Sequence, residues 1–229
     1  MRVVTIDGPA GAGKSTVSRL LADRLGWRLL DTGAMYRSVA LAALRAGADF
    51  ASDDALGAVA ASVTVKLPPG HVLLDGEDVT RLIRTVEVTR ASSKLAESPS
   101  VRRRLVELQR AFAAENDVIA EGRDQGTVVF PDALRKYFLT ASLEERARRR
   151  HAEFEAKNDP ITLEAVLADL RERDARDAAR AVAPMKPARD ASVIDTTGLS
   201  LDEVVGFIER EVLDRLAELG SDAPQGTNP

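Results

Sequence analysis

Short apolar runs alternate with apolar stripes of helical spacing along the chain. Val3 to Ile6 is a β-branched run that stops at Gly8, which predicts a buried first strand. Val17 to Leu25 repeats apolar residues at helical spacing and stops at Gly26, which predicts a helix. The same criteria predict further strands at 27–30, 117–120, 136–140 and 192–196, and further helices at 34–46, 85–95, 99–114, 143–157, 162–181 and 201–219. Strands that alternate with helices favour an α/β fold, in which a parallel sheet is covered by helices.

One segment, from residue 62 to about 79, breaks this alternation. Its apolar residues recur at every second position, and turn-forming sequences at 68–70 and 75–76 divide it into short strands. We therefore predict a small β insertion within a single domain that spans residues 1–219. The predicted parts are a core of about 1–61, 85–150 and 181–219, the insertion of about 62–84, and a lid of about 151–180. The polar, turn-rich residues 220–229 are predicted to form a disordered tail.

Composition restricts the possible functions. The 229 residues are 45% hydrophobic and 30% charged, which is typical of a globular protein. The formal net charge of -4 argues against binding to a nucleic acid polymer, which requires a basic face. The absence of cysteine excludes disulfides, thiolate metal ligands and cysteine nucleophiles. Arginine is nevertheless clustered locally, which favours a small anion bound in a cleft.

The beginning of the chain bears on where the protein acts. Met1 and Arg2 run directly into the first predicted strand, without the pattern of a secretory signal peptide. No apolar run approaches the ~20 residues that are needed to span a bilayer. We therefore expect a cytoplasmic protein with no membrane partner, and a monomer by default.

The glycine-rich sequence after the first strand matches the spacing G-x-x-x-x-G-K-[ST] of a phosphate-binding loop. Backbone N–H groups in such a loop surround phosphate oxygens, and the following helix N-terminus adds partial positive charge. Its lysine reaches the β and γ phosphates of ATP, and its serine hydroxyl ligates Mg²⁺. The predicted ATP-binding residues are Gly8, Pro9, Ala10, Gly11, Ala12, Gly13, Lys14, Ser15 and Thr16, with Ser15 also a metal ligand.

Two other interpretations of this loop are weaker. A glycine-rich turn that only packs the first helix would leave the Lys14-Ser15 pair without a purpose. A switching GTPase would carry the base-reading sequence N/T-K-x-D, which is absent from the chain. We therefore expect a protein that transfers phosphate from ATP.

The stretch 31–37 supplies a first candidate site for an acceptor. Tyr36 and Arg37 lie one turn into the predicted second helix, after a strand expected to neighbour the phosphate loop. A guanidinium group presents a planar fork of donors that suits phosphate, so Arg37 is a candidate for holding an acceptor phosphate. The alternative is a surface cation beside a half-buried tyrosine.

The stretch 118–124 supplies a second set of candidates. An apolar strand ends in Glu121, at the position of a carboxylate that would hold Mg²⁺ or its waters. Arg123 is a candidate for bridging donor and acceptor phosphates, and Asp124 for accepting a hydrogen bond from an exocyclic amine. The alternative is a solvated salt bridge at the end of the strand.

The predicted helix at 162–181 carries a third set. Residues 173, 176, 177 and 180 share one helical face, which holds arginines and one aspartate. This pattern fits a mobile lid that closes arginines over the phosphates and excludes water. The alternative is i,i+4 pairing of Asp169 with Arg173 and of Glu172 with Arg176, each worth only ~0.3 to 0.5 kcal/mol.

Taken in order, these stretches resemble the bacterial cytidylate kinase family. The matching sequences are I-D-G-P-A-G-A-G-K-S-T at 6–16, L-L-D-T-G-A-M-Y-R at 29–37, G-R-D-Q-G-T-V-V-F-P at 122–131 and R-D-A-R-D-A-A-R-A-V-A-P at 173–184. The resemblance covers nearly everything from Val3 to about Leu216. It implies a P-loop NTPase fold with an adenylate-kinase-like sheet, a nucleotide-monophosphate-binding region enlarged by the β insertion, and a helical lid.

The resemblance also implies roles for particular residues. Arg37 and Arg123 would hold the phosphate of CMP or dCMP, and Thr32 and Tyr36 would line its site. The residues implied for cytosine are Ser93, Arg102 and Asp124, those for the sugar are Arg173 and Asp177, and Arg180 would lie near the acceptor. We predict that phosphoryl transfer depends on Lys14, Arg123, Arg173 and Arg176, and that Ser15 and Glu121 hold Mg²⁺.

Some positions depart from the family pattern. Thr32 stands where serine is common and keeps the hydroxyl, whereas Glu121 stands where aspartate is common and is one methylene longer. Gln125 replaces a usual methionine. Two other functions stay open: a related P-loop kinase for UMP, another nucleotide or a small alcohol, and a regulatory module that hydrolyses ATP slowly.

Overall fold

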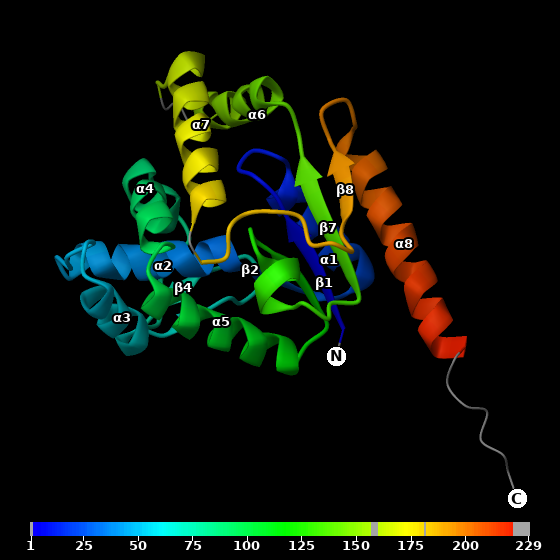
Figure 1. Cartoon of the computed structure of the whole chain (residues 1–229), viewed down its shortest axis with the longest axis horizontal. Helices are drawn as coiled ribbons and strands as arrows, with labels where there is room; N and C mark the ends of the chain where they lie inside the picture. The colour runs from blue at the N-terminus through cyan, green and yellow to red at the C-terminus, as the bar shows by residue number, and fades with distance from the viewer. Residues whose placement is uncertain (1, 157–159, 181, 222–229) are drawn as a thin grey trace, which may run out of the picture.

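The computed structural model describes residues 2–156, 160–180 and 182–221. Its centre is a sheet with the strand order β2-β6-β1-β7-β8, in which neighbouring strands run parallel (Figure 1). The strands are β1 (Val3–Asp7), β2 (Arg28–Asp31), β6 (Val118–Glu121), β7 (Arg135–Thr140) and β8 (Ser192–Asp195). The register aligns Glu121 with Ile6 and with Asp31, so the carboxyl ends of β1, β2 and β6 meet at one edge.

Helices cover both faces of this sheet. They are α1 (Lys14–Leu25), α2 (Thr32–Arg45), α3 (Asp53–Ser62), α4 (Val86–Leu95), α5 (Pro99–Ala114), α6 (Leu143–Glu155), α7 (Leu163–Ala179) and α8 (Leu201–Ser221), with a short 3-10 turn η1 (Leu82–Arg84) and a π-helical turn η2 (Gln125–Val129). The structure confirms the predicted α/β class.

Alternation along β6 separates two apolar clusters, because successive strand residues point to opposite faces. Ile119 packs with residues of α1 and α8, whereas its neighbours Val118 and Ala120 pack with α2, α4 and α5. A third and smaller cluster joins α6 to α7 through Ala147, Val166 and Leu170. In Figure 1 these two helices lie beyond the carboxyl ends of the strands, on the side of the phosphate loop.

The predicted β insertion is confirmed as a three-stranded sheet in the order β3-β4-β5. Its strands are β3 (Val65–Lys66), β4 (Leu73–Leu74) and β5 (Glu77–Asp78), and both pairings are antiparallel. The buried Leu74 and Val79 belong to the same apolar cluster as α2 and α3. The insertion therefore adds to the apolar core that contains residues of α2 and α3.

Helix α3 was absent from the sequence-based prediction. It is rich in alanine and contains Gly57, so its apolar stripe is weak. Its start is well marked, because the Ser52 side chain accepts a hydrogen bond from the Ala55 N–H, and Asp53 and Asp54 occupy the first turn. These capping signals would have identified the helix.

Several predicted boundaries differ from the structure. Helix α2 begins at Thr32, two residues before the predicted start, because the Asp31 carboxylate accepts a hydrogen bond from Ala34 N–H at 2.7 Å. Helix α8 continues to Ser221, so the first two residues of the predicted tail are helical. Residues 157, 181 and 222–229, on which parts of the predicted helices and tail fall, lie outside the described residues. Within the described ranges, no helix combines the length and apolarity required to cross a membrane.

Candidate phosphate and nucleotide site

The glycine-rich loop turns tightly out of β1. Gly8 has φ of 140°, and a Cβ atom there would lie 1.9 Å from the carbonyl oxygen of Leu139 on β7. Gly11 and Gly13 also have positive φ angles, of 79° and 89°. Gly13 precedes α1 without any side-chain cap, so the first N–H groups of this 12-residue helix are not bound by a capping side chain. The loop and helix start together form an anion-binding geometry.

Lys14 lies in the middle of this geometry. Its side chain is almost fully buried, and its Nζ donates a hydrogen bond to the carbonyl oxygen of Pro9 at 2.7 Å. Burial lowers the pKa of Lys14, and the charge of Arg123 lowers it further, while Glu121 acts in the opposite direction. A buried ammonium group beside other cations favours an anionic partner.

Ser15 and Glu121 form a candidate metal site. The Ser15 hydroxyl donates a hydrogen bond to Glu121 Oε1 at 2.6 Å, and Glu121 Oε2 is buried without a hydrogen-bond partner. Burial raises the pKa of Glu121, and the nearby charge of Asp31 raises it further. Hydroxyl and carboxylate oxygens are ligands that Mg²⁺ prefers, and Mg²⁺ keeps several waters and phosphate oxygens in its shell. This pair therefore fits a hard divalent cation that is shared with a bound phosphate.

The first turns of α2 contain Thr32, Tyr36 and Arg37, which were predicted to bind the acceptor nucleotide. Thr32 Oγ1 donates a hydrogen bond to the backbone carbonyl of Glu121 at 2.6 Å, which fixes the start of α2 against this strand. Arg37 Nη2 lies 3.5 Å from Asp31 Oδ2, and its Nε is buried without a partner. The Tyr36 hydroxyl accepts from Arg102 Nη1 at 3.4 Å.

A buried ion pair joins α5 to the turn after β6. Arg102 and Asp124 pair with each other, and each is only 4% exposed. Burial and the Asp124 charge raise the pKa of Tyr36 to about 12, although Arg102 opposes this shift. Ser93 is also buried, on α4, but among the described residues no hydrogen bond or ion pair links it to Arg102 or Asp124.

Helix α7 contacts the turn after β6. Arg123 Nε lies 2.9 Å from Asp177 Oδ2, and Asp177 also pairs with Arg180. Burial lowers the pKa of Arg173 to about 10, the charge of Arg123 contributes in the same direction, and Arg173 Nε has no hydrogen-bond partner. The structure therefore gathers Arg123, Arg173, Asp177 and Arg180 in one place.

Arg176 of α7 makes a local contact instead. Its Nη2 lies 3.7 Å from Glu172 Oε1, and its side chain is 32% exposed. This is the local i,i+4 contact that the alternative interpretation expected. The other expected local pair is not observed, because Asp169 lies 3.7 Å from Arg90 of α4 instead of pairing with Arg173.

Sequence reasoning missed a guanidinium group that links the lid to the phosphate loop. Arg146 on α6 donates through Nη1 to the carbonyl of Ala10 at 3.1 Å, and its Nη2 lies 2.7 Å from Asp174 Oδ2 on α7. Arg146 is 6% exposed. The charged helix that contains it predicts solvated side chains, so no sequence signal separated this arginine from its neighbours.

Asp7 was also missed. Its carboxylate is 4% exposed and accepts hydrogen bonds from the N–H groups of Gln125 at 2.9 Å and Gly126 at 2.8 Å. Burial raises the pKa of Asp7 to about 6, against the effect of these two donors. An acid at the end of a buried strand, immediately before a phosphate loop, is the signal that would have identified it.

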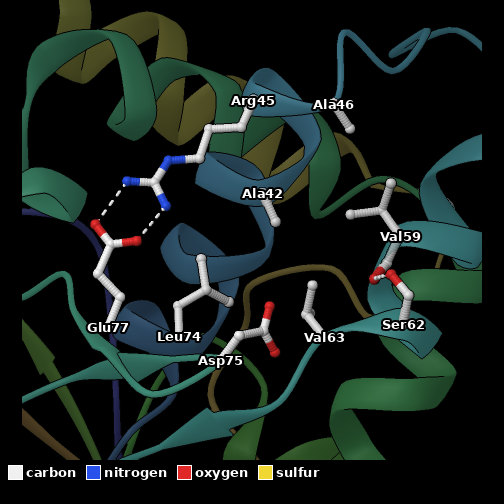
Figure 2. Close-up of a pocket in the computed structure, with 9 residues that line it drawn as sticks. All are labelled: Ala42, Arg45, Ala46, Val59, Ser62, Val63, Leu74, Asp75 and Glu77. Atoms are coloured by element: carbon white, nitrogen blue, oxygen red, sulfur yellow. Dashed lines mark hydrogen bonds and ion pairs between the residues drawn. The ribbon is translucent and has the colours of Figure 1, made fainter.

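A separate cavity of about 400 Å³ lies between α2, α3 and the small sheet (Figure 2). At the side of this cavity, Arg45 donates hydrogen bonds to both carboxylate oxygens of Glu77, at 2.7 and 2.9 Å. The cavity is lined from the carboxyl-terminal end of α2, whereas Tyr36 and Arg37 lie near its beginning. It is therefore distinct from the phosphate site.

Comparisons with known proteins identify the family of this chain. A family model described as cytidylate kinase matches residues 4–213. The chain is 49% identical over 219 residues to a cytidylate kinase of Stutzerimonas stutzeri, covering 93% of this chain and 96% of the relative. It is 52% identical over 207 residues to one of Aeromonas hydrophila, covering 89% and 90%. A relative of the same name in Pseudomonas aeruginosa is 49% identical over 214 residues, covering 91% and 93%.

Proposed function

The chain belongs to the cytidylate kinase family, and we propose that it transfers the γ-phosphoryl group of ATP to CMP or dCMP, giving ADP and CDP or dCDP. One observation carries this proposal. Arg123, a candidate for holding the acceptor, is close enough to Lys14 of the phosphate loop to lower its pKa, and its neighbour Asp124 is held in a buried pair with Arg102. Groups for the donor phosphate, the acceptor phosphate and a base thus adjoin one another.

The donor end of the site consists of the phosphate loop. The backbone N–H groups of residues 8–16, apart from Pro9, which has none, would surround the phosphates of ATP, and Lys14 would contact the β and γ phosphates. Ser15 and Glu121 would hold Mg²⁺. When bound, this ion supplies positive charge that offsets the charge of the phosphate oxygens.

The acceptor end would hold its phosphate between Arg37 and Arg123, with Thr32 and Tyr36 lining the site. Phosphoryl transfer depends mainly on position and on positive charge, because the loose transition state needs little covalent assistance. The attacking phosphate oxygen is already anionic near neutral pH, so no general base is required. The residues of this chain therefore align the two phosphates and stabilise the charge between them.

The base would be recognised by the buried pair on α5 and the turn after β6. Asp124 would accept a hydrogen bond from the amino group of cytosine, and the ion pair with Arg102 would orient this carboxylate. Ser93 would complete the base site from α4. UMP presents a carbonyl where CMP presents the amino group, so the hydrogen-bond-accepting oxygens of Asp124 would disfavour UMP.

Residues of about 151–180 would act as a lid that closes over the substrates. Arg173 and Asp177 would contact the sugar, and Arg180 would lie near the acceptor. A contact between Arg176 and the transferring phosphate would require it to leave its exposed pair with Glu172. Closure excludes water, which would otherwise receive the phosphoryl group.

The setting follows from the same proposal. The protein would act in the cytoplasm as a monomer, with ATP and a nucleoside monophosphate as its partners. The small-molecule partners are supported by the family and by the buried Arg173 beside Arg123, and the net charge of -4 gives no support to a nucleic acid polymer.

A coupled assay of ADP release tests the proposal. The purified chain is given ATP and Mg²⁺ with CMP, dCMP, UMP, AMP, GMP or no acceptor. Turnover with CMP and dCMP well above the others is the expected result. Equal turnover with another acceptor would show that CMP and dCMP are not the preferred substrates. Turnover without any acceptor would indicate an ATPase instead of a kinase.

A further inference from the structure

The carboxylate of Asp7 has no part in the roles described above, although it is one of the most buried acids of the site. It ends β1, and Gly8 of the phosphate loop follows it directly. Oδ1 accepts from the N–H of Gln125 at 2.9 Å and Oδ2 accepts from the N–H of Gly126 at 2.8 Å. Both of its oxygens are therefore used to hold one turn, on a segment more than a hundred residues away.

That turn begins the π-helical element η2, whose first N–H groups lack partners within the element. Asp124 occupies the N-cap position and is of a residue type that commonly caps helices, but its side chain makes no capping hydrogen bond. Its carboxylate pairs with Arg102 instead. Asp7 supplies from another strand the cap that Asp124 does not provide, and so leaves Asp124 free to face a base.

The other side of Asp7 is rigid. It pairs with Phe138 in the β1–β7 register, and Gly8 after it is packed against the Leu139 carbonyl so closely that no Cβ fits. A fixed strand end therefore connects the phosphate loop on one side with the start of η2 on the other. Arg123 and Asp124 lie immediately before that start.

We propose that Asp7 is a positioning residue for phosphoryl transfer: by capping η2 it fixes Arg123 and Asp124 relative to the phosphate loop. This inference rests on the proposed kinase function. Asp7 itself touches neither substrate. It sets the distance between the phosphate loop, which would bind the donor, and Arg123 and Asp124, which would bind the acceptor.

Asp7→Asn tests the proposal, because the amide offers only one acceptor oxygen and turns its NH₂ group toward a backbone N–H. The variant keeps the size of the side chain but loses one hydrogen bond and displaces the turn. Misplacement of reacting groups by an ångström costs about 100-fold in rate, so we expect kcat to fall about 10- to 100-fold. The KM for ATP is expected to change less than about threefold, because the phosphate loop keeps its own geometry.

Asp117→Asn is the matched control. Asp117 precedes β6 and accepts a hydrogen bond from the backbone N–H of Arg2 at 2.7 Å. It therefore ties β1 to β6 at their amino-terminal ends, whereas Asp7 lies at the carboxyl end of β1. Loss of the Asp117 carboxylate is expected to lower stability while kcat stays within about twofold of the unaltered protein, since the turn after β6 does not move. Both variants are assayed with CMP at pH 8 after thermal melts establish that they are folded.

Hydrogen exchange by mass spectrometry gives a readout that is independent of turnover. Peptides that contain Gln125 and Gly126 are expected to exchange faster in Asp7→Asn than in the unaltered protein or in Asp117→Asn. If the unaltered chain shows no CMP-dependent turnover, the proposed function fails. The exchange result then still decides whether Asp7 holds the turn.

A folded Asp7→Asn protein with unchanged kcat, or with unchanged exchange at 125–126, would overturn the proposal. So would a fall in kcat that only matches the unfolded fraction. If this variant does not fold, Asp7→Glu decides: its extra methylene must displace the turn, so a lowered kcat with unchanged KM for ATP supports the proposal and an unchanged kcat overturns it.

Discussion

Arg123 and Asp177 form an ion pair between the turn after β6 and the lid helix, with 2.9 Å between Arg123 Nε and Asp177 Oδ2. The same arginine lowers the pKa of Lys14, so one guanidinium group adjoins both the lid and the phosphate loop. Asp177 of α7 therefore contacts the same arginine whose charge acts on Lys14.

Arg123→Ala is expected to reduce kcat with CMP by about 1,000-fold, since an arginine at the transferring phosphate is worth about 10³ to 10⁵ in GTPases. The variant should remain folded, because Arg123 is partly exposed and lies outside the apolar clusters. Steady-state ADP release measures the change. Arg103→Ala on the exposed face of α5 is the control, and a kcat for Arg123→Ala close to that of this control would contradict the role.

Asp124→Asn is expected to weaken discrimination between CMP and UMP. A hydrogen bond to a charged group is worth about 1.5 to 3 kcal/mol, so the ratio of kcat/KM for CMP to that for UMP should fall about 10- to 100-fold. The measurement is the ratio itself, which corrects for any general loss of activity from leaving Arg102 unpaired. A variant that retains the original ratio would show that the base is read elsewhere.

Asp177 makes the stability of the protein depend on pH in acid. Burial alone would raise the pKa of Asp177, but the charges of Arg123, Arg180 and Arg173 outweigh it and lower the pKa below 3.8. A lowered pKa stabilises the fold above about pH 3.8, and this contribution is lost as pH falls through the pKa of the folded protein.

Asp177→Asn should therefore lower the free energy of unfolding by about 3 to 5 kcal/mol at pH 7, because it leaves buried guanidinium groups without their partner. The difference between the variant and the unaltered protein should shrink below pH 3.8. Urea unfolding at pH 7, 5 and 3 measures both effects. A difference that is the same at all three pH values would exclude an electrostatic origin.

Asp174→Asn tests the connection between the lid and the phosphate loop. Arg146 would keep its hydrogen bonds to the carbonyls of Ala10 and Ala141 but lose its ion pair with Asp174. We expect a loss of about 1 to 3 kcal/mol in stability and faster hydrogen exchange in α7. Asp169→Asn on the same helix is the control, because its contact with Arg90 is exposed and should contribute little. Equal exchange in the two variants would contradict this role for Asp174.

The elements that the sequence predicted best are those whose cause is local. The strand, loop and helix around Gly8 to Thr16 were readable because a glycine-rich turn and a helix start are set by adjacent residues. Helix α3 shows the limit of apolar periodicity, because its alanine-rich sequence has only a weak apolar stripe. Its start is nevertheless marked by the capping residue Ser52. Local capping chemistry would have corrected that omission.

The sequence predicted which residues belong to the candidate site better than it predicted their contacts. The stretch 118–124 indicated Asp124 and the family resemblance added Arg102, but only the packing of α5 against the turn after β6 makes them a buried pair. Helical spacing placed Arg173 and Arg176 on one face of α7, yet the structure buries the first and turns the second toward Glu172. Which residue on a charged face points inward depends on how the helix docks, and spacing does not specify this.

The sequence by itself determined the α/β class, the phosphate loop and the residue types available for binding phosphate, because each depends on neighbours within a few positions. Only the tertiary structure decided that Asp7 caps the turn at Gln125 and that Arg146 binds the carbonyl of Ala10. These partners are separated by more than a hundred residues, and parallel strands bring them together at the carboxyl edge of the sheet. Hydrogen bonds of this kind depend on strand order and helix docking, which no local pattern of apolar and polar residues encodes.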